Sequence, residues 1–212
     1  MPILNKKLAL VAPFASTDKL RPALQCVRFT RNGQAVTTVA TDSYALVRIT
    51  CHDLPLAADF SIVPNSPSAT DLAGELLVPA TVVSATAKDI PKKSSLSVLL
   101  TAALIRTQDS TAAELVATDL EKVSRHGFRV CDEKYPDTDS LFTVPVKDAV
   151  KIRVNAEYLG KIADLFHAFN DNGKGNLNAI DIEISSDLST PIRFIAEHDG
   201  HKAEALLMKI SQ

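Results

Sequence analysis

The sequence predicts an α+β protein built from three copies of one element, a helix followed by an antiparallel β-meander. The first observation is a repeat: Val-Ala-Thr-Asp occupies residues 39–42 and again residues 116–119, each time between two strand-like runs. The second is a candidate amphipathic helix upstream of each copy, and of a third, degenerate copy at residues 194–199. Two such elements can bury their apolar faces against each other, with the helices on one face of the sheets, so we call each one a half-unit.

The first half-unit covers residues 5–51. Asn5 is a suitable N-cap for its helix, and Pro13 should kink or shorten that helix because proline lacks a backbone donor. Asn32-Gly33 predicts a hairpin turn, since both residue types tolerate positive φ. The apolar helix positions are Leu8, Val11 and either Phe14 or Ala15, and the expected strands span residues 26–30, 36–40 and 45–50.

A long connection at residues 52–74 is rich in Pro, Ser, Ala and Asp. Connections of this length are unusual inside compact domains, so this one is either functional or poorly ordered. It contains one strand-like run, at residues 60–63.

The second half-unit covers residues 76–131. Pro79 suits the first turn of its helix, and Pro91 ends that helix. The apolar stripe consists of Val82 or Val83, Ala87 and Ile90, and strands are expected at residues 96–100, 103–107, 112–117 and 122–130. The first two half-units form an expected domain over residues 1–132, and a linker over residues 133–150 follows.

The third half-unit covers residues 151–212. A predicted strand at residues 151–154 leads into a helix capped by Asn155 and ended by the Gly-rich residues 172–176. The apolar positions of this helix form one continuous face, which we expect to be buried: Tyr158, Leu159, Ile162, Leu165, Phe166 and Phe169. The remaining expected strands span residues 180–185, 192–196 and 203–210, with Asp199-Gly200 in the last turn.

The composition is that of a globular protein, with 46% hydrophobic and 23% charged residues. A net charge of −2 does not single out nucleic-acid binding, although a local basic face can lie on an acidic body. Three widely spaced Cys without zinc-ligand spacing indicate reduced thiols in a cytoplasmic protein. Residues 6–15 faintly resemble a secretory signal but are short and contain Pro13, so we expect a helix there and no membrane segment.

We find no catalytic constellation and predict that the protein is not an enzyme and holds no cofactor. The five His lack metal-ligand spacing, and His198 and His201 are more typical of a solvated hairpin than of a metal site. Gly173-Lys174-Gly175 follows a helix, which is the wrong context for a phosphate-binding loop. Asp42 and Asp119 lie in separate half-units, so we expect each to cap a turn by accepting hydrogen bonds from nearby backbone amides.

Several motifs resemble one family, the bacterial β sliding clamps. Residues 40–46, Ala-Thr-Asp-Ser-Tyr-Ala-Leu, are similar to the Ala-Thr-Asp-Gly-His-Arg-Leu signature of the central clamp domain. The resemblance continues through residues 78–80, reaches an aromatic-Pro-Asp linker at residues 135–137, and ends in Leu-Leu-Met at residues 206–208. The chain thus resembles a shortened clamp, the central domain plus half of the last domain, and a DNA-clamp-like fold is expected.

The resemblance implies two sets of functional residues. Basic residues on the polar sides of the helices would face double-stranded DNA without reading its sequence: Lys6, Lys7, Lys88, Lys92, Lys93 and Lys161. A pocket would take peptides of a DNA polymerase or clamp loader, and the residues that match its segments are Thr41, Ser43, Tyr44, Leu46, Tyr135, Pro136, Leu207 and Met208. Two departures stand out: Ser43-Tyr44-Ala45 replaces a Gly-His-Arg type, and Lys209 replaces a Pro. Tyr44 is alternatively a core residue.

The resemblance implies a processivity factor of DNA replication. A clamp ring encloses DNA with twelve half-units, so a chain with three half-units would need four copies for a ring. The alternative is a monomeric or dimeric adaptor that keeps the clamp fold as a peptide-binding module and forms no ring.

Overall fold

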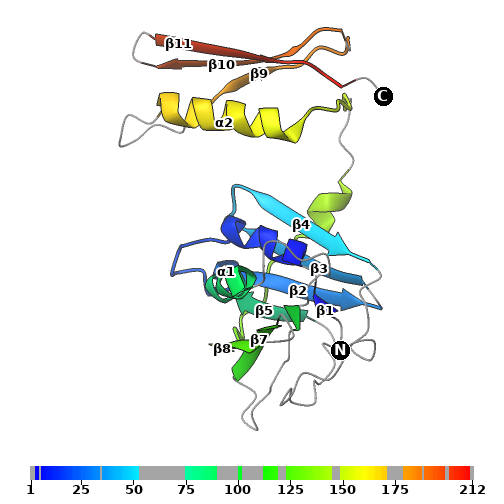
Figure 1. Cartoon of the computed structure of the whole chain (residues 1–212), viewed down its shortest axis with the longest axis vertical. Helices are drawn as coiled ribbons and strands as arrows, with labels where there is room; N and C mark the ends of the chain where they lie inside the picture. Colours follow the sequence, from blue (N-terminus) through cyan, green and yellow to red (C-terminus); the bar gives the residue numbers. More distant parts are fainter. Residues whose placement is uncertain are drawn as a thin grey trace. The chain divides into compact units, whose positions relative to one another are not determined.

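The computed structural model describes residues 3–4, 6–33, 35–52, 75–89, 100–101, 112–118, 123–144, 149–170, 179–187, 189–198 and 201–210. The chain divides into two compact units, Met1–Thr138 and Asp139–Gln212, which we call the N-terminal and C-terminal units (Figure 1). The boundary falls within residues 133–150, the expected linker. Several predicted features lie outside the described residues, among them the Asn5 cap, the runs at 60–63 and 103–107, the helix end at 172–176 and the turn at 199–200.

The first half-unit contains a 3₁₀ helix η1 (Lys6–Phe14), a short helix η2 (Pro22–Gln25) and strands β2 (Cys26–Asn32), β3 (Ala35–Thr41) and β4 (Leu46–Cys51). Pro13 lies one residue before the end of η1, so the helix is short, as expected. The hairpin between β2 and β3 is confirmed with a shifted turn. Asn32 pairs with Ala35, so Asn32 belongs to the strand pairing and the turn follows it, and Gly33 has a φ of 60°. The strand pairing extends one residue further than the Asn-Gly motif indicated.

The second half-unit contains β5 (Glu75–Pro79), α1 (Ala80–Asp89), β6 (Leu100–Thr101), β7 (Ala112–Thr118) and β8 (Val123–Arg129). Pro79 closes β5 instead of starting the helix, and it pairs with Cys26 across the sheet. Val83 and Thr86 are the buried positions of α1, whereas Ile90 and the predicted helix end lie outside the described residues. His126 Nε2 of β8 lies 2.6 Å from Asp89 Oδ2 of α1, and this contact links the helix to its sheet.

Strand exchange joins the two half-units of the N-terminal unit. The short strand β1 (Ile3–Leu4), which precedes η1, pairs with β6 of the second half-unit. In the same way β5, which precedes α1, pairs with β2 of the first half-unit. Two four-stranded sheets result, with strand orders β4-β3-β2-β5 and β1-β6-β7-β8. Each sheet is therefore completed by a strand from the other half-unit.

One hydrophobic core fills the space between these sheets and the two helices. Its fully buried members come from both half-units, including Leu8, Val27, Phe29, Val83 and Leu115. Helices η1 and α1 pack against each other over this core (Figure 1). Because neither half-unit encloses the core alone, the two must fold together.

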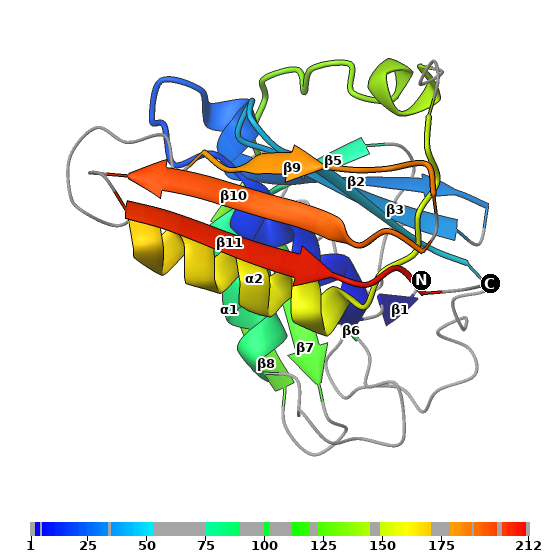
Figure 2. The same cartoon turned by 90° about the horizontal axis from the view of Figure 1, so that it is seen from above.

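The C-terminal unit contains a short helix η4 (Ser140–Thr143), α2 (Ala156–Asn170), β9 (Asp181–Glu183), β10 (Ile192–His198) and β11 (His201–Leu207). The Asn155 cap is confirmed, because its Oδ1 accepts the Glu157 backbone N–H at 2.8 Å. The sheet has three strands in the order β11-β10-β9. Helix α2 packs against β10 and β11 on one face of it (Figure 2).

Two predictions for this unit are wrong. Residues 151–154 are not part of a strand. The apolar face of α2 is only partly covered: Phe166 is buried and Ile162 and Phe169 are half-buried, but Tyr158, Leu159 and Leu165 are exposed. A single three-stranded sheet is too narrow to cover an apolar face of that width.

Candidate functional site

Basic residues lie on the two helices of the N-terminal unit. Lys7 of η1 and Lys88 of α1 are exposed and Lys6 is half-buried, whereas Lys92 and Lys93 lie outside the described residues. A hollow of about 660 Å³ opens between the end of η1 and α1. Its lining includes small and polar residues together with Lys88: Pro13, Ser16, Thr17, Ala80 and Ser84. Exposed ammonium groups beside such a surface can approach phosphates without a large desolvation cost.

Lys161 of α2 has a different environment. Its Nζ lies 2.7 Å from Glu157 Oε1, one helical turn away, and 5.3 Å from the centre of the Tyr158 ring. The carboxylate offsets part of its positive charge, which weakens Lys161 as a candidate for phosphate contact.

The repeat motif forms a tight turn between β3 and β4. Asp42 Oδ1 accepts the backbone N–H groups of Tyr44 and Ala45, each at 2.8 Å. These bonds stabilise the carboxylate and lower the pKa of Asp42. The turn-capping prediction is confirmed for Asp42, whereas Asp119 lies outside the described residues. Ser43 has a φ of 83°, a left-handed conformation that costs a residue with a Cβ roughly 1–2 kcal/mol.

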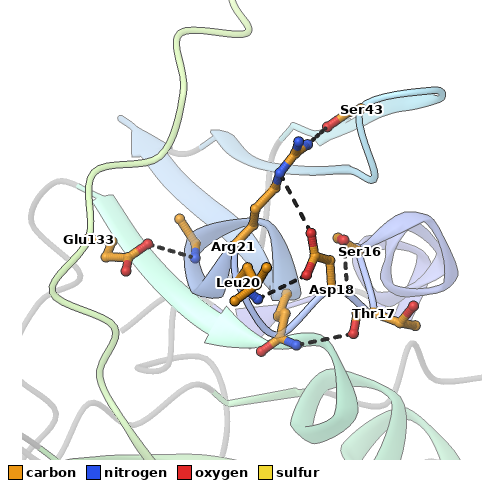
Figure 3. Close-up of polar contacts among 9 residues, drawn as sticks. Ser16, Thr17, Asp18, Leu20, Arg21, Ser43 and Glu133 are labelled. Carbon is orange, nitrogen blue, oxygen red and sulfur yellow. Dashed lines mark hydrogen bonds and ion pairs between the residues drawn. The ribbon is translucent and has the colours of Figure 1, made fainter.

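Arg21 ties this turn to the loop before η2. Its Nη1 donates to Ser43 Oγ at 2.9 Å, and its Nε lies 3.7 Å from Asp18 Oδ2 (Figure 3). Within η2, the Ala23 backbone N–H donates to Glu133 Oε2 at 3.3 Å, which holds the segment after β8 (Figure 3). No sequence pattern pointed to Arg21, because its partner Ser43 lies 22 residues away.

Three of the residues predicted to form a peptide pocket are buried or half-buried in this unit. Tyr135 packs with Leu46 in a small cluster on the outer face of the first sheet, and Thr41 is buried nearby at the end of β3. The Arg28 guanidinium lies 5.4 Å from the centre of the Tyr135 ring. Burial raises the pKa of Tyr135 to about 12, so the phenol stays neutral.

Exposed residues form the other part of the predicted pocket. Ser43 and Pro136 are exposed, and the Tyr44 side chain is 98% accessible. The alternative that Tyr44 is a core residue is therefore wrong. Asp42 directs the chain outward at this turn, which leaves the Tyr44 ring in solvent beside the sheet.

The two predicted pocket residues of the C-terminal unit lie at a groove. Leu207 is buried against the core of this unit, whereas Met208 is 62% exposed. The groove has a volume of about 650 Å³ and runs between α2 and β11. Part of its lining was expected in the core or at no site: Tyr158, Ile162, Leu165, Leu206 and Ile210. Periodicity identified the helical members as apolar but could not show that Tyr158 and Leu165 are exposed.

Lys209 is a structural residue. Its Nζ donates to the backbone carbonyls of Ser185 and Asp187 at 2.7 and 2.6 Å, and the side chain is buried. These bonds fix the turn after β9 to the chain that follows β11. Lys209, which stands where the clamp motif has a Pro, therefore stabilises this part of the C-terminal unit.

The described residues contain no group of three or more His, Cys, Asp or Glu side chains that could hold a metal ion. Among these residues, no helix has the length and apolar character to cross a membrane. Cys26 is buried with Cys131 beside it, and burial chiefly raises its pKa to about 12, which makes this thiol a poor nucleophile.

The sequence matches no protein-family model and no curated protein. Solved structures match over nearly the whole chain. The DNA polymerase sliding clamp of Bacillus subtilis shares 18% identity and a TM-score of 0.69, covering 99% of this chain and 49% of that one. The chain has the sliding-clamp fold.

Other structures with this fold give the same picture. The β subunit of the Streptococcus pyogenes DNA polymerase shares 16% identity and a TM-score of 0.70, covering 100% of this chain and 50% of that one. The Bartonella birtlesii sliding clamp bound to griselimycin shares 14% identity and a TM-score of 0.61. The match covers 99% of this chain and 51% of that clamp. The chain spans about half the length of these clamps, and the likeness establishes its clamp fold.

Proposed function

We propose that this protein is a sliding-clamp-like processivity factor that encircles double-stranded DNA and binds peptides of replication partners. The observation that carries the proposal is the sliding-clamp fold over 99% of the chain, with η1 and α1 packed side by side and bearing lysines. Clamps are not enzymes, so this function needs no catalytic residue or cofactor.

Contact with DNA in this proposal is electrostatic. Lys6, Lys7 and Lys88 attract phosphates without reading base edges, which suits a protein that must move along the duplex. Lys92 and Lys93 follow α1 in the sequence and would add to the same surface. Lys161 contributes less, because it is paired with Glu157.

Partner binding uses apolar anchors of a polymerase or loader peptide. In the N-terminal unit, Tyr135 and Leu46 offer an apolar base, and the exposed Tyr44 ring offers a contact at its rim. In the C-terminal unit, the groove at Leu207 and Met208 is wide enough for an apolar side chain. Such anchors supply most of the affinity of peptide sites.

A closed ring needs several copies. The chain has three half-units, and twelve half-units make a ring, so four copies form the proposed ring. This assembly lets DNA enter while the ring forms from its subunits.

The decisive experiment compares retention on circular and linear DNA. The protein is assembled on a nicked plasmid, half of the sample is linearised, and both are passed over a gel-filtration column in moderate salt. A ring stays with the circle and slides off the linear molecule. A double variant, Lys7→Glu with Lys88→Glu, should lose retention on the circle, while the exposed loop variant Lys19→Glu should keep it.

Equal retention on both DNA forms would indicate side-on binding and would contradict encirclement. Loss of retention in the Lys19→Glu variant to the same degree as in the double variant would contradict the assignment of the helix lysines.

The alternative adaptor function is favoured by three specific observations. The net charge is −2, and Lys161 on α2 is already paired with Glu157, so the third helix presents little free positive charge. The groove beside α2 is apolar enough for a peptide without any ring. A protein that binds a partner peptide but is never retained on circular DNA would be such an adaptor.

A further inference from the structure

The N-terminal unit shows how two half-units of this chain complete each other. The strand before each helix joins the other half-unit's sheet, next to the first strand of that meander: β1 joins β6, and β5 joins β2. Helix α1 also contacts β2 of the other half-unit. As a result Val27 and Phe29, the apolar residues of β2 on the helix side, are fully buried.

The C-terminal unit contains one half-unit, with a segment before its helix, the helix and a meander, but its described residues include no second half-unit to pair with. Strand β9 corresponds to β2, because it is the first meander strand after the helix and lies at the edge of the order β11-β10-β9. Residues 151–154 correspond to β5, because they directly precede the helix, yet they join no sheet. The sheet therefore has three strands where the other two sheets have four.

Apolar side chains mark the uncovered edge. Ile182 pairs with Phe194, whose side chain is buried beside Phe166 of α2, so Ile182 points to the helix side of the sheet. It is nevertheless 51% exposed, and Ile184, two residues further, is exposed to a similar degree. Phe29, the matching residue of β2, is fully buried. Phe29 is covered by helices from both half-units, whereas α2 is the one helix that the described residues place on the sheet of β9.

One flank of α2 is uncovered on the same side. The groove takes Tyr158 and Leu165 from one flank of the helix, beside β11. Leu159 and Ala163, four residues apart, lie on the opposite flank, toward β9, and both are exposed. In the N-terminal unit the equivalent space is filled by the packing of η1 against α1.

The backbone of residues 151–154 is suited to strand pairing. Ile152 and Val154 are half-buried against the core while Lys151 and Arg153 are exposed, an alternation typical of a strand. The Arg153 carbonyl accepts the Ile210 N–H at 2.8 Å. Successive residues of an extended chain direct their backbone groups to opposite edges, so those of residues 152 and 154 point away from Ile210.

The charges of the two edges are complementary. The charged residues of β9 are Asp181 and Glu183, and those of residues 151–154 are Lys151 and Arg153. Glu183 also lies 3.5 Å from Arg193, which leaves its carboxylate able to accept a second cation. The N-terminal unit has an ion pair across the matching strands, since Arg28 of β2 lies 3.7 Å from Glu75 of β5. An edge that is basic on one segment and acidic on the other is self-complementary under a two-fold axis.

We propose that a second copy of this chain completes the C-terminal unit by two-fold strand exchange. Residues 151–154 of each copy add to the β9 edge of the other, which gives two four-stranded sheets like those of the N-terminal unit. The two α2 helices pack through Leu159 and Ala163, and Ile182 and Ile184 become buried. The groove beside β11 stays open for a different ligand.

The test measures the mass of the full-length protein by analytical ultracentrifugation over a range of concentrations. The wild type is expected to form dimers or multiples of dimers. Ile182→Lys places an ammonium in the buried interface, so the dimer dissociation constant should rise on the order of 100-fold. The matched control is Met208→Lys, an equally exposed apolar residue at the groove, which should leave dimerisation unchanged.

Reversing the charges on the two edges distinguishes a lost interface contact from a folding defect. Lys151→Glu with Arg153→Glu should weaken dimerisation, because it opposes Asp181 and Glu183 of the other copy. Adding Asp181→Lys and Glu183→Lys to the same chain should restore it, which a folding defect would not do. A wild type that stays monomeric at every concentration, or a Met208→Lys variant that dissociates while Ile182→Lys does not, would overturn the proposal.

The pairing goes beyond the proposed clamp function and can be judged apart from it. A dimer lost in Ile182→Lys but never retained on circular DNA would support the pairing and contradict the clamp. If the Ile182→Lys variant kept the solution mass of the wild-type assembly and was retained on circular DNA, the result would support the clamp and contradict the pairing.

Discussion

At the scale of residues, the turn at Asp42 and Ser43 explains a departure from the clamp signature. The sequence has Ser where the clamp motif has Gly, and the structure gives Ser43 a φ of 83°. Glycine accepts this left-handed conformation without steric cost. Ser43 keeps it because Asp42 caps the turn and Arg21 bonds the Ser43 hydroxyl.

Substitution at Ser43 should reveal this backbone strain. Ser43→Ala and Ser43→Gly both lose the Arg21 bond, but only Ala keeps a Cβ at positive φ. We expect the Gly variant to be more stable than the Ala variant by about 1 kcal/mol in urea unfolding. At Ala45, where φ is ordinary, Gly should instead be the less stable choice. Equal stability of the two Ser43 variants would exclude a left-handed turn.

The Asp42 carboxylate should make the turn sensitive to acid. Its pKa is lower when folded than when unfolded, because the Tyr44 and Ala45 amides bond the charged form. Its stabilising contribution is present above the unfolded pKa of about 4 and is lost as the pH falls through the lower folded pKa. The stability difference between wild type and Asp42→Asn should therefore be largest near neutral pH and shrink in acid. A difference that grew on acidification would have the wrong sign.

At the scale of elements, the shared core makes one cooperative body of the first two half-units. Leu8 of η1 is 1% exposed and lies in one cluster with Phe29 of β2 and Val83 of α1. Thr38 of β3 adds a buried hydrogen bond to the Leu8 carbonyl at 2.9 Å. Helix η1 is short and of the 3₁₀ type, so its stability comes from this packing more than from its own hydrogen bonds.

Truncation of Leu8 should therefore destabilise both half-units at once. Leu8→Ala leaves a cavity in the shared core and should cost about 3 kcal/mol of unfolding free energy. The neighbouring Leu10 is 62% exposed, so Leu10→Ala should change stability by less than about 0.5 kcal/mol. Chemical denaturation followed by far-ultraviolet circular dichroism measures both. Separate transitions for the two half-units would contradict a shared core.

At the scale of the whole molecule, the odd number of half-units governs assembly. Two half-units close a core in the N-terminal unit, and the described residues of the third form a sheet with no strand from another half-unit. Two-fold pairing of that third half-unit gives a dimer with six half-units. Two dimers then supply the twelve half-units of the proposed ring, so assemblies of even numbers are favoured over trimers.

Pairing between copies should make only part of the unfolding depend on concentration. Association stabilises the folded form by mass action, so the Tm of the C-terminal unit should rise with protein concentration while that of the N-terminal unit stays constant. Differential scanning calorimetry of the full chain at several concentrations measures both. Ile182→Lys should remove the dependence, whereas a concentration-dependent Tm that persists in this variant would point to a different interface.

The sequence by itself determined the features that rest on local interactions. The three helix-plus-meander half-units, the Asn155 cap and the Asp42 turn all depend on residues close together in the chain, so periodicity and turn chemistry predicted them. Strand registers were less accurate, as the shifted turn after Asn32 shows, because strand pairing across the sheet sets them. For the proposed sites, the sequence indicated which residue types occur and in what order. It did not indicate the burial or the contacts of those residues.

Only the tertiary structure decided which surfaces are covered. The exchange of β1 and β5 between half-units, the exposure of Tyr44 and the bond from Arg21 to Ser43 all join residues far apart in sequence. The same holds for α2, whose apolar face was expected to be buried like that of any amphipathic helix. An apolar pattern indicates that one face of a helix is suited to burial. Whether that face is buried depends on whether a sheet or another helix can cover it. In the part of the C-terminal unit that the structure describes, the sheet has three strands and α2 is the one helix packed on it, so that face stays open for another molecule.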